Sequence, residues 1–128
     1  MTLFNALIRT HHITSRKKIT KLTQAAKLHD VFVLLRSSGP PGIMYVEGHE
    51  TGVRGWVEVV ANLRYKDYQL AARPGLVVRE GITAYSLIAE SALAEIEAVK
   101  DFGVQMQRRK VYEWWRAGMG YAGHPDRL

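Results

Sequence analysis

Short apolar runs alternate with amphipathic stretches along the first three-fifths of the chain. Between Arg16 and His29, apolar residues recur at helical spacing while most lysines lie away from that stripe, which predicts an amphipathic helix capped by Ser15. Two apolar runs flank the glycine- and proline-rich segment 37–42 and predict a hairpin. The expected elements are a strand over 5–13, a helix over 16–29, strands over 31–35 and 43–48, a helix capped by Thr51, and a strand over 65–73.

This order of elements predicts an α+β fold. Strand, helix, strand, strand, helix, strand is the βαββαβ order of a ferredoxin-like split βαβ sandwich, in which two helices cover one face of an antiparallel sheet. We expect this core over residues 5–75. Helical patterns over 83–100 and 104–117 predict additional C-terminal helices within an extension over 81–117, followed by a flexible tail over 118–128. The 128 residues are expected to form a single domain.

Composition narrows the class of protein. The chain is 47% hydrophobic and 23% charged, which is typical of a globular domain. No apolar run is long enough for a membrane span, and the N-terminus lacks the pattern of a secretory signal. The absence of cysteine excludes disulfides, thiolate zinc sites and a cysteine nucleophile. We therefore expect an intracellular protein of the nucleus or cytoplasm that does not bind membranes, and the sequence leaves its oligomeric state open.

The positive charge is concentrated in the first third of the chain. The formal net charge is +6, and residues 1–41 hold seven of the 18 basic residues but one of the 12 acidic residues. Three basic residues in a row at 16–18 oppose the dipole of the helix that they begin, at a cost of a few tenths to about 1 kcal/mol each. Such a one-sided basic surface is expected of a protein that meets phosphate, although it also serves solubility.

Motifs for catalysis are missing. His11 and His12 are expected to point to opposite faces of a strand, one bonded within the fold and one exposed, and no carboxylate or cysteine ligands accompany them, so we expect no metal site. The glycines give no phosphate-binding fingerprint, and Ser37 and Ser38 lack a nucleophile-elbow context. We expect a protein that is not an enzyme and has no cofactor. An acylphosphatase-like small hydrolase remains a distant alternative.

Two segments carry a resemblance to a known family. They are Thr10-His-His-Ile-Thr-Ser15 with Lys17 and Lys18, and Gly39-Pro-Pro-Gly-Ile-Met-Tyr-Val-Glu-Gly48, followed by Trp56, Leu63 and Arg64-Tyr-Lys66. Together they resemble the C-terminal domain of the pre-mRNA-processing factor three family, which also follows RWD domains in RWD-domain-containing proteins. The resemblance covers roughly residues 8–73. These 128 residues have no room for an RWD domain, so we expect either a standalone protein or a part of a longer one.

The resemblance implies a ferredoxin-like fold and, for the splicing branch, a nuclear ribonucleoprotein role in which the domain binds small nuclear RNA at a duplex with a single-stranded extension. The turn Thr10–Ser15, which carries the resemblance, lies in the same segment as the excess of positive charge. The hypothesis is therefore a non-catalytic RNA-binding module linked to small nuclear RNA or pre-mRNA processing. Its expected RNA-binding residues are Arg9, His11, His12, Ser15, Arg16, Lys17, Lys18, Lys21, Arg64 and Lys66.

The alternative is a protein-interaction module that uses the C-terminal helices. Trp114 and Trp115 are adjacent, so one is expected to pack inward and the other to be partly exposed. With Arg108 and Arg109 they would form the contact surface for a protein partner. A standard RNA-recognition motif is disfavoured, because Tyr45 is the only aromatic residue of the hairpin strand that contains it.

Overall fold

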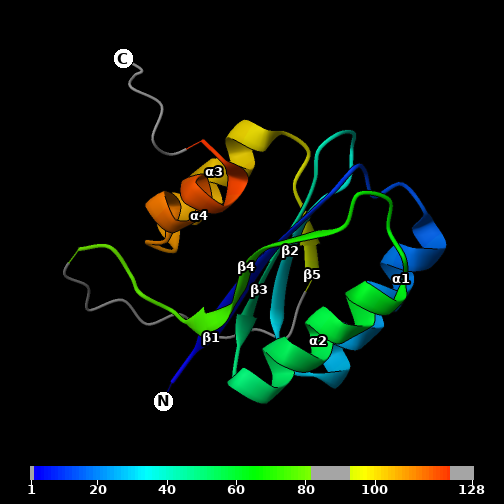
Figure 1. Ribbon diagram of the computed structural model, residues 1–128, viewed down its shortest axis with the longest axis horizontal. Helices are drawn as coiled ribbons and strands as arrows, with labels where there is room; N and C mark the ends of the chain where they lie inside the picture. Colours follow the sequence, from blue (N-terminus) through cyan, green and yellow to red (C-terminus); the bar gives the residue numbers. More distant parts are fainter. Residues whose placement is uncertain (1, 82–92, 122–128) are drawn as a thin grey trace.

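The computed structural model describes residues 2–81 and 93–121, and the predicted α+β class is confirmed. Helices α3 and α4 follow the first six elements and the short strand β5 (Figure 1). The elements are β1 (Phe4–Thr10), α1 (Arg16–Leu28), β2 (Phe32–Arg36), β3 (Gly42–Gly48), α2 (Glu50–Asn62), β4 (Gln69–Leu76), β5 (Leu93–Glu95), α3 (Val99–Arg108) and α4 (Tyr112–Met119).

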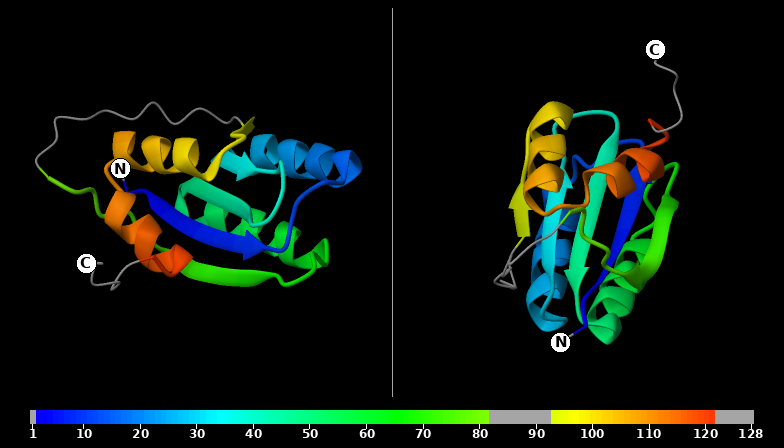
Figure 2. Two further views of the ribbon diagram at one scale, coloured as in Figure 1. Left: turned by 90° about the horizontal axis from the view of Figure 1, so that it is seen from above. Right: turned by 90° about the vertical axis from the view of Figure 1, so that its left-hand side faces the viewer.

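The strands form one mixed sheet in the order β4-β1-β3-β2-β5 (Figure 2). The pairs β1–β3, β1–β4 and β2–β3 are antiparallel, and β5 adds to the edge of β2 in parallel. The order of the first four strands is compatible with a ferredoxin-like fold. Helices α1 and α2 lie on one face of the sheet, and α3 and α4 lie on the other (Figure 1).

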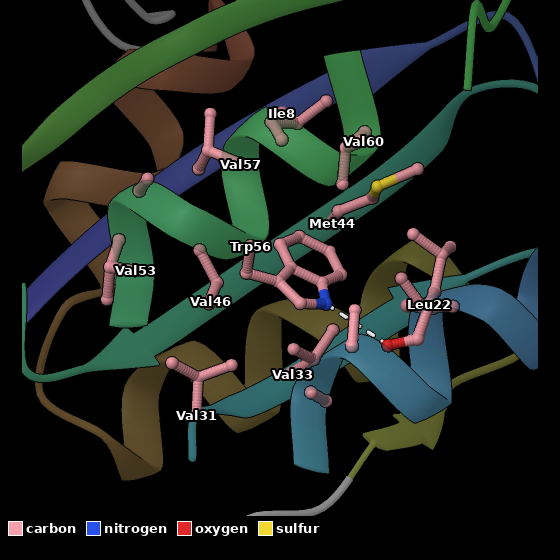
Figure 3. Packing of buried hydrophobic residues seen from close by; sticks show 14 of the residues in the cluster. Ile8, Leu22, Val31, Val33, Met44, Val46, Val53, Trp56, Val57 and Val60 are labelled. Carbon is pink, nitrogen blue, oxygen red and sulfur yellow. Dashed lines mark hydrogen bonds between the residues drawn. The ribbon is translucent and has the colours of Figure 1, made fainter. Parts of the chain in front are cut away.

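The core under α1 and α2 is built from alternate strand residues. Trp56 of α2 is fully buried at its centre, among Leu22 of α1 and Met44 and Val46 of β3 (Figure 3). Its indole Nε1 donates a 3.1 Å hydrogen bond to the carbonyl oxygen of Leu22, so the ring also ties the two helices together. Burying a large apolar side chain of this kind stabilises the fold by about 1.5–3 kcal/mol.

The opposite face of the sheet is covered as well. Leu7, Ile43 and Tyr45 alternate with the residues of the first core and point to this side, where Phe102 of α3 and Trp115 of α4 pack on them. All of these residues are at most 3% exposed. At β1 and β3, the described part of the C-terminal helices therefore covers the sheet face on which RNA bases could otherwise stack.

The local predictions hold in the first two thirds of the chain, with corrections at boundaries. The predicted cap of α1 is confirmed, because the Ser15 hydroxyl accepts a 3.2 Å hydrogen bond from the amide of Lys18. The cap predicted at Thr51 is wrong: Thr51 lies inside α2, and His49 precedes the helix without a side-chain cap. Strand β4 begins at Gln69 rather than at Tyr65, because the chain turns at Asp67, which has a φ of 55°.

The C-terminal predictions need larger corrections. Residues 82–92 and 122–128 lie outside the described part, so most of the helix predicted over 83–100 and most of the predicted tail stay predictions. Leu93–Glu95 is a strand and not a helix, because it hydrogen-bonds to the free edge of β2. The helix predicted over 104–117 is interrupted at Lys110, whose φ of 62° ends α3. Met119, assigned to the tail, is buried in α4.

Candidate nucleic-acid interface

A basic hollow lies beside the N-terminus of α1, between the β1–α1 loop and the α2–β4 loop. Its volume is about 280 Å³, and no acidic residue belongs to its lining in the described part of the chain. We call it the basic groove. It is lined by His12, Thr14, Ser15, Lys18, Arg64, Tyr65 and Lys66.

The first turn of α1 forms one wall of the basic groove. Ser15 caps the helix, and the turn contains no acidic residue. The exposed amide groups of a helix N-terminus carry a partial positive charge, which favours an anion and disfavours cations. The lysines that begin α1 therefore cost helix stability when nothing is bound. A phosphate in the groove would turn that cost into an attraction.

Tyr65 lines the basic groove and was not among the residues expected from the sequence. It is 8% exposed, and burial raises the pKa of its phenol to about 12. The Nζ atom of Lys18 lies 4.7 Å from the centre of its ring, so the ring holds this ammonium group by a cation–π contact. The Tyr65 hydroxyl has no hydrogen-bond partner among the described residues.

Arg64 and Lys66 reach the basic groove from the loop after α2. Arg64 follows Leu63, the residue that caps the C-terminal end of α2, and has a φ of 60°, a left-handed conformation that glycine usually adopts at this position. A side chain there costs about 1–2 kcal/mol of backbone strain. The backbone carbonyl of Lys66 accepts a 3.0 Å hydrogen bond from the amide of His11, which fixes the two loops side by side.

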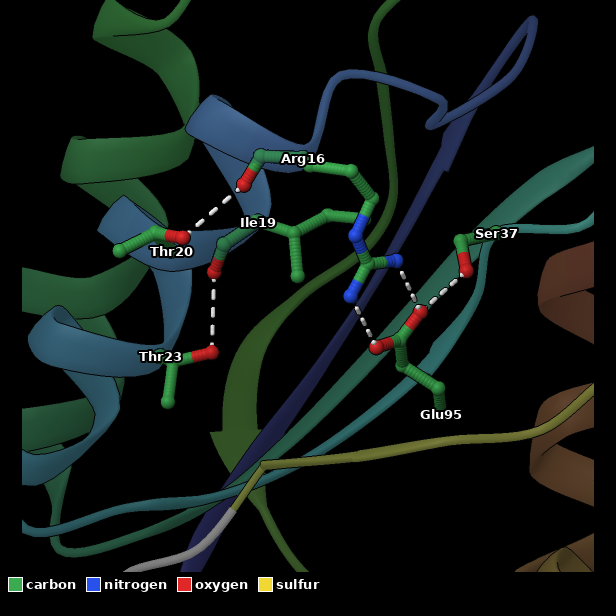
Figure 4. Close-up of polar contacts among 6 residues, drawn as sticks. All are labelled: Arg16, Ile19, Thr20, Thr23, Ser37 and Glu95. Atoms are coloured by element: carbon green, nitrogen blue, oxygen red, sulfur yellow. Dashed lines mark hydrogen bonds and ion pairs between the residues drawn. The ribbon is translucent and has the colours of Figure 1, made fainter.

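Two of the expected basic residues lie apart from the basic groove. The guanidinium of Arg16 donates two 3.0 Å hydrogen bonds to Glu95 of β5, and the hydroxyl of Ser37 donates a third of 2.6 Å (Figure 4). These hydrogen bonds hold the pKa of Glu95 below its usual value, and the bonded carboxylate raises that of Arg16. Arg9 instead donates to the carbonyl of Met119 at 2.6 Å and to Gln69 at 2.8 Å, so it anchors the end of α4.

The remaining expected residues flank the basic groove. Lys17 and Lys21 are exposed on α1, and Lys21 follows Lys18 by three residues, on the same side of the helix. The prediction that His11 and His12 point to opposite faces of a strand is wrong. Strand β1 ends at Thr10, both histidines are exposed, and their ring centres lie 4.8 Å apart. The expectation that one of them is bonded inside the fold is wrong for the same reason.

The residues of the alternative, protein-interaction surface face mostly inward. As predicted, Trp115 is buried at 3% exposure and Trp114 is half-buried, edge-on to Tyr45. Arg109 stacks over the ring of Phe32 at 3.6 Å and is 12% exposed. Of the four candidates, only Arg108 is exposed. Trp114, Trp115 and Arg109 therefore attach the C-terminal helices to the sheet.

A buried charge cluster was missed by sequence reasoning. Glu47 of β3 is 3% exposed and lies 2.8 Å from Arg79 and 3.5 Å from Arg109. It also accepts a 2.6 Å hydrogen bond from the hydroxyl of Tyr45, whose pKa is raised well above its usual value mainly by burial and also by the Glu47 charge. The only available signal was the acidic residue inside an apolar strand, which indicates a buried partner of opposite charge.

No group of three or more His, Asp or Glu side chains in the described ranges is arranged to hold a metal ion. Helices long and apolar enough to cross a membrane are likewise not found among these residues. Neither a scan against models of protein families nor a search of curated proteins found a match to this chain.

Proposed function

We propose that this chain is a non-catalytic RNA-binding module with a ferredoxin-like core, and that it contacts the phosphate backbone of RNA through the basic groove. The observation that carries the proposal is the convergence of Lys18, Arg64 and Lys66, from segments far apart in the sequence, on a hollow at a helix N-terminus. Three cations without an acidic neighbour in this lining repel one another. An RNA phosphate is the ligand that relieves the repulsion.

The shape of the protein also favours this mode over reading bases on the sheet. Both faces of the sheet carry helices, so the loops and the exposed sides of helices such as α1 are the surfaces that favour contact with RNA. Binding through phosphates is strongly dependent on salt and weakly dependent on sequence. The resemblance to the domain of pre-mRNA-processing factor three extends the proposal to small nuclear RNA with a duplex and a single-stranded extension.

Substitution of the groove cations tests the proposal. The groove variant replaces Lys18, Arg64 and Lys66 by glutamine. A matched control replaces three exposed basic residues elsewhere, Lys27, Lys100 and Arg108, so that the net charge falls equally.

We expect the groove variant to lose most of its affinity for an RNA hairpin and its salt slope to fall by about three, one for each phosphate contact removed. The control should keep its slope. Equal losses in both variants would mean a generic basic surface, and no binding by the unmodified protein would refute the function.

A further inference from the structure

A second cavity lies next to the basic groove, on the other side of the histidine pair. It has a volume of about 480 Å³ and opens to solvent at the ends of β1 and β4. His11 lines this cavity, whereas His12 lines the basic groove, and the ring centres of the two are 4.8 Å apart. An RNA strand with one phosphate in the basic groove therefore has the second cavity within reach of its next nucleotide.

The walls of this cavity combine flat, apolar surfaces with a fixed donor side. Pro40 and Pro41 form an apolar wall, and the His11 ring lines the same cavity. The Arg9 guanidinium is held in place by the carbonyl of Met119, at 2.6 Å.

A single carboxylate provides the acceptor. Asp67 lies in the cavity lining, and its side chain is 66% exposed. Its Oδ2 is 3.8 Å from Nδ1 of His11, so the carboxylate lies beside the ring. The cavity thus offers a donor from Arg9 and a two-oxygen acceptor from Asp67.

We propose that this cavity binds an unpaired guanine base of the RNA and that Asp67 determines the specificity. The Watson–Crick edge of guanine carries one acceptor, O6, followed by two adjacent donors, N1–H and the 2-amino group. The two donors match the two oxygens of the Asp67 carboxylate, and O6 can accept a hydrogen bond from the guanidinium of Arg9. Adenine, cytosine and uracil each lack a second adjacent donor, so none can bond both oxygens of Asp67.

Stacking completes the recognition. A planar base in this cavity would lie against the His11 imidazole and the proline wall, as unpaired bases commonly stack on flat side chains. This inference rests on the proposed function, because the base is brought to the cavity by the phosphate contacts of the basic groove. It goes further by assigning a base preference to a protein whose other contacts read only the backbone.

The test measures the affinity of single-stranded uridine octamers by fluorescence anisotropy. One octamer carries a single central guanosine, a second carries inosine, which lacks the 2-amino group, at that position, and a third is uridine throughout. We expect the guanosine octamer to bind between about 5- and 150-fold more tightly than the uridine octamer, the range of one bidentate base contact. The inosine octamer should fall between them.

The variant Asp67→Asn should lose the preference. Asparagine adopts the left-handed backbone of position 67, where φ is 55°, so the loop is retained. Its amide presents one donor and one acceptor, and it cannot accept from both guanine donors. The control Asp101→Asn changes the net charge equally on the exposed surface of α3 and should keep the preference.

The outcomes separate this inference from the function on which it rests. Equal binding of all octamers by the unmodified protein, or a guanosine preference that survives Asp67→Asn, overturns the guanine site and leaves the RNA function standing. Failure of every octamer and of structured RNA to bind overturns both.

Discussion

Arg16 donates two 3.0 Å hydrogen bonds to the carboxylate of Glu95, which lies 79 positions later in the chain. This pairing divides the basic cluster at the start of α1. Arg16 ties the edge strand β5 to the helix, whereas no acidic side chain in the described ranges forms an ion pair with Lys17, Lys18 or Lys21. The sequence presents these four cations as one group, but only the lysines remain uncompensated.

The Arg16–Glu95 pair predicts a specific loss of stability in acid. The pKa of Glu95 is lowered from 4.5 in the folded protein, chiefly by its hydrogen bond from Arg16 and then by that from Ser37. Its contribution to folding is therefore complete above pH 4.5 and is lost as the pH falls through the lowered pKa. Urea unfolding of the unmodified protein and of Glu95→Gln should differ at pH 7, and the difference should shrink as the pH falls below 4.5 and through the lowered pKa. A constant difference across this range would contradict the assignment.

Arg64→Gly should separate stability from binding. Glycine relieves the left-handed strain at position 64 at some entropic cost, so the free energy of unfolding should stay constant or rise by up to about 1 kcal/mol. RNA affinity should fall, because a groove cation is lost. The matched control is Lys110→Gly, which makes the same change after α3, at a φ of 62°, and should leave affinity unchanged. Equal RNA affinities of the two variants would show that Arg64 does not contact RNA.

Tyr65→Phe should stabilise the protein. The Tyr65 hydroxyl is buried without a hydrogen-bond partner in the described ranges, so its removal should raise the free energy of unfolding by about 1 kcal/mol. Because burial raises the pKa of Tyr65 from 10.0 to about 12, the unmodified protein also loses stability as the pH rises through this interval. The advantage of Tyr65→Phe should therefore grow between pH 10 and 12 in urea unfolding. A destabilised variant would show that the hydroxyl has a partner.

Glu47→Gln should be the most damaging of these substitutions. It leaves the guanidinium groups of Arg79 and Arg109 without their shared carboxylate in a setting where all three side chains are at most 15% exposed. Removing one partner from a buried pair typically costs about 3–5 kcal/mol. The control Glu50→Gln breaks only the exposed pair with Arg54 and should cost below about 0.5 kcal/mol. Similar urea midpoints for both variants would contradict the role of the cluster.

The local part of the fold was predictable because its signals lie within a few residues of one another. Ser15 caps the helix that the spacing of Ile19 and Leu22 predicts, and Trp56 is buried as its helical stripe requires. Strand β5 was not predictable, because Leu93–Glu95 gains its conformation from the free edge of β2 and not from its own residues. A distant partner overrides local propensity in such cases.

The candidate site was predictable in composition but not in geometry. The lysines of α1 and the pair Arg64 and Lys66 were named from the sequence. No neighbouring residue, however, indicates that Lys18 lines the basic groove whereas Arg16 pairs with an acidic residue. The partner of Lys18 is Tyr65, 47 positions away, and the partner of Arg16 is Glu95, 79 positions away. The covering of the second sheet face likewise depends on contacts between distant segments. These contacts decide which charges are left for a ligand.

The central claim is that the basic groove binds RNA through phosphate contacts, and a salt titration tests it most directly. An RNA hairpin with a single-stranded 3′ extension is titrated by fluorescence anisotropy at about 50 and 200 mM salt, beside a blunt duplex and a single strand. With Lys18, Lys21, Arg64 and Lys66 each on a phosphate, the affinity should fall by about 50- to 150-fold between the two conditions. The extended hairpin should bind most tightly. An affinity that does not change with salt, or no binding at about 50 mM, would contradict the account.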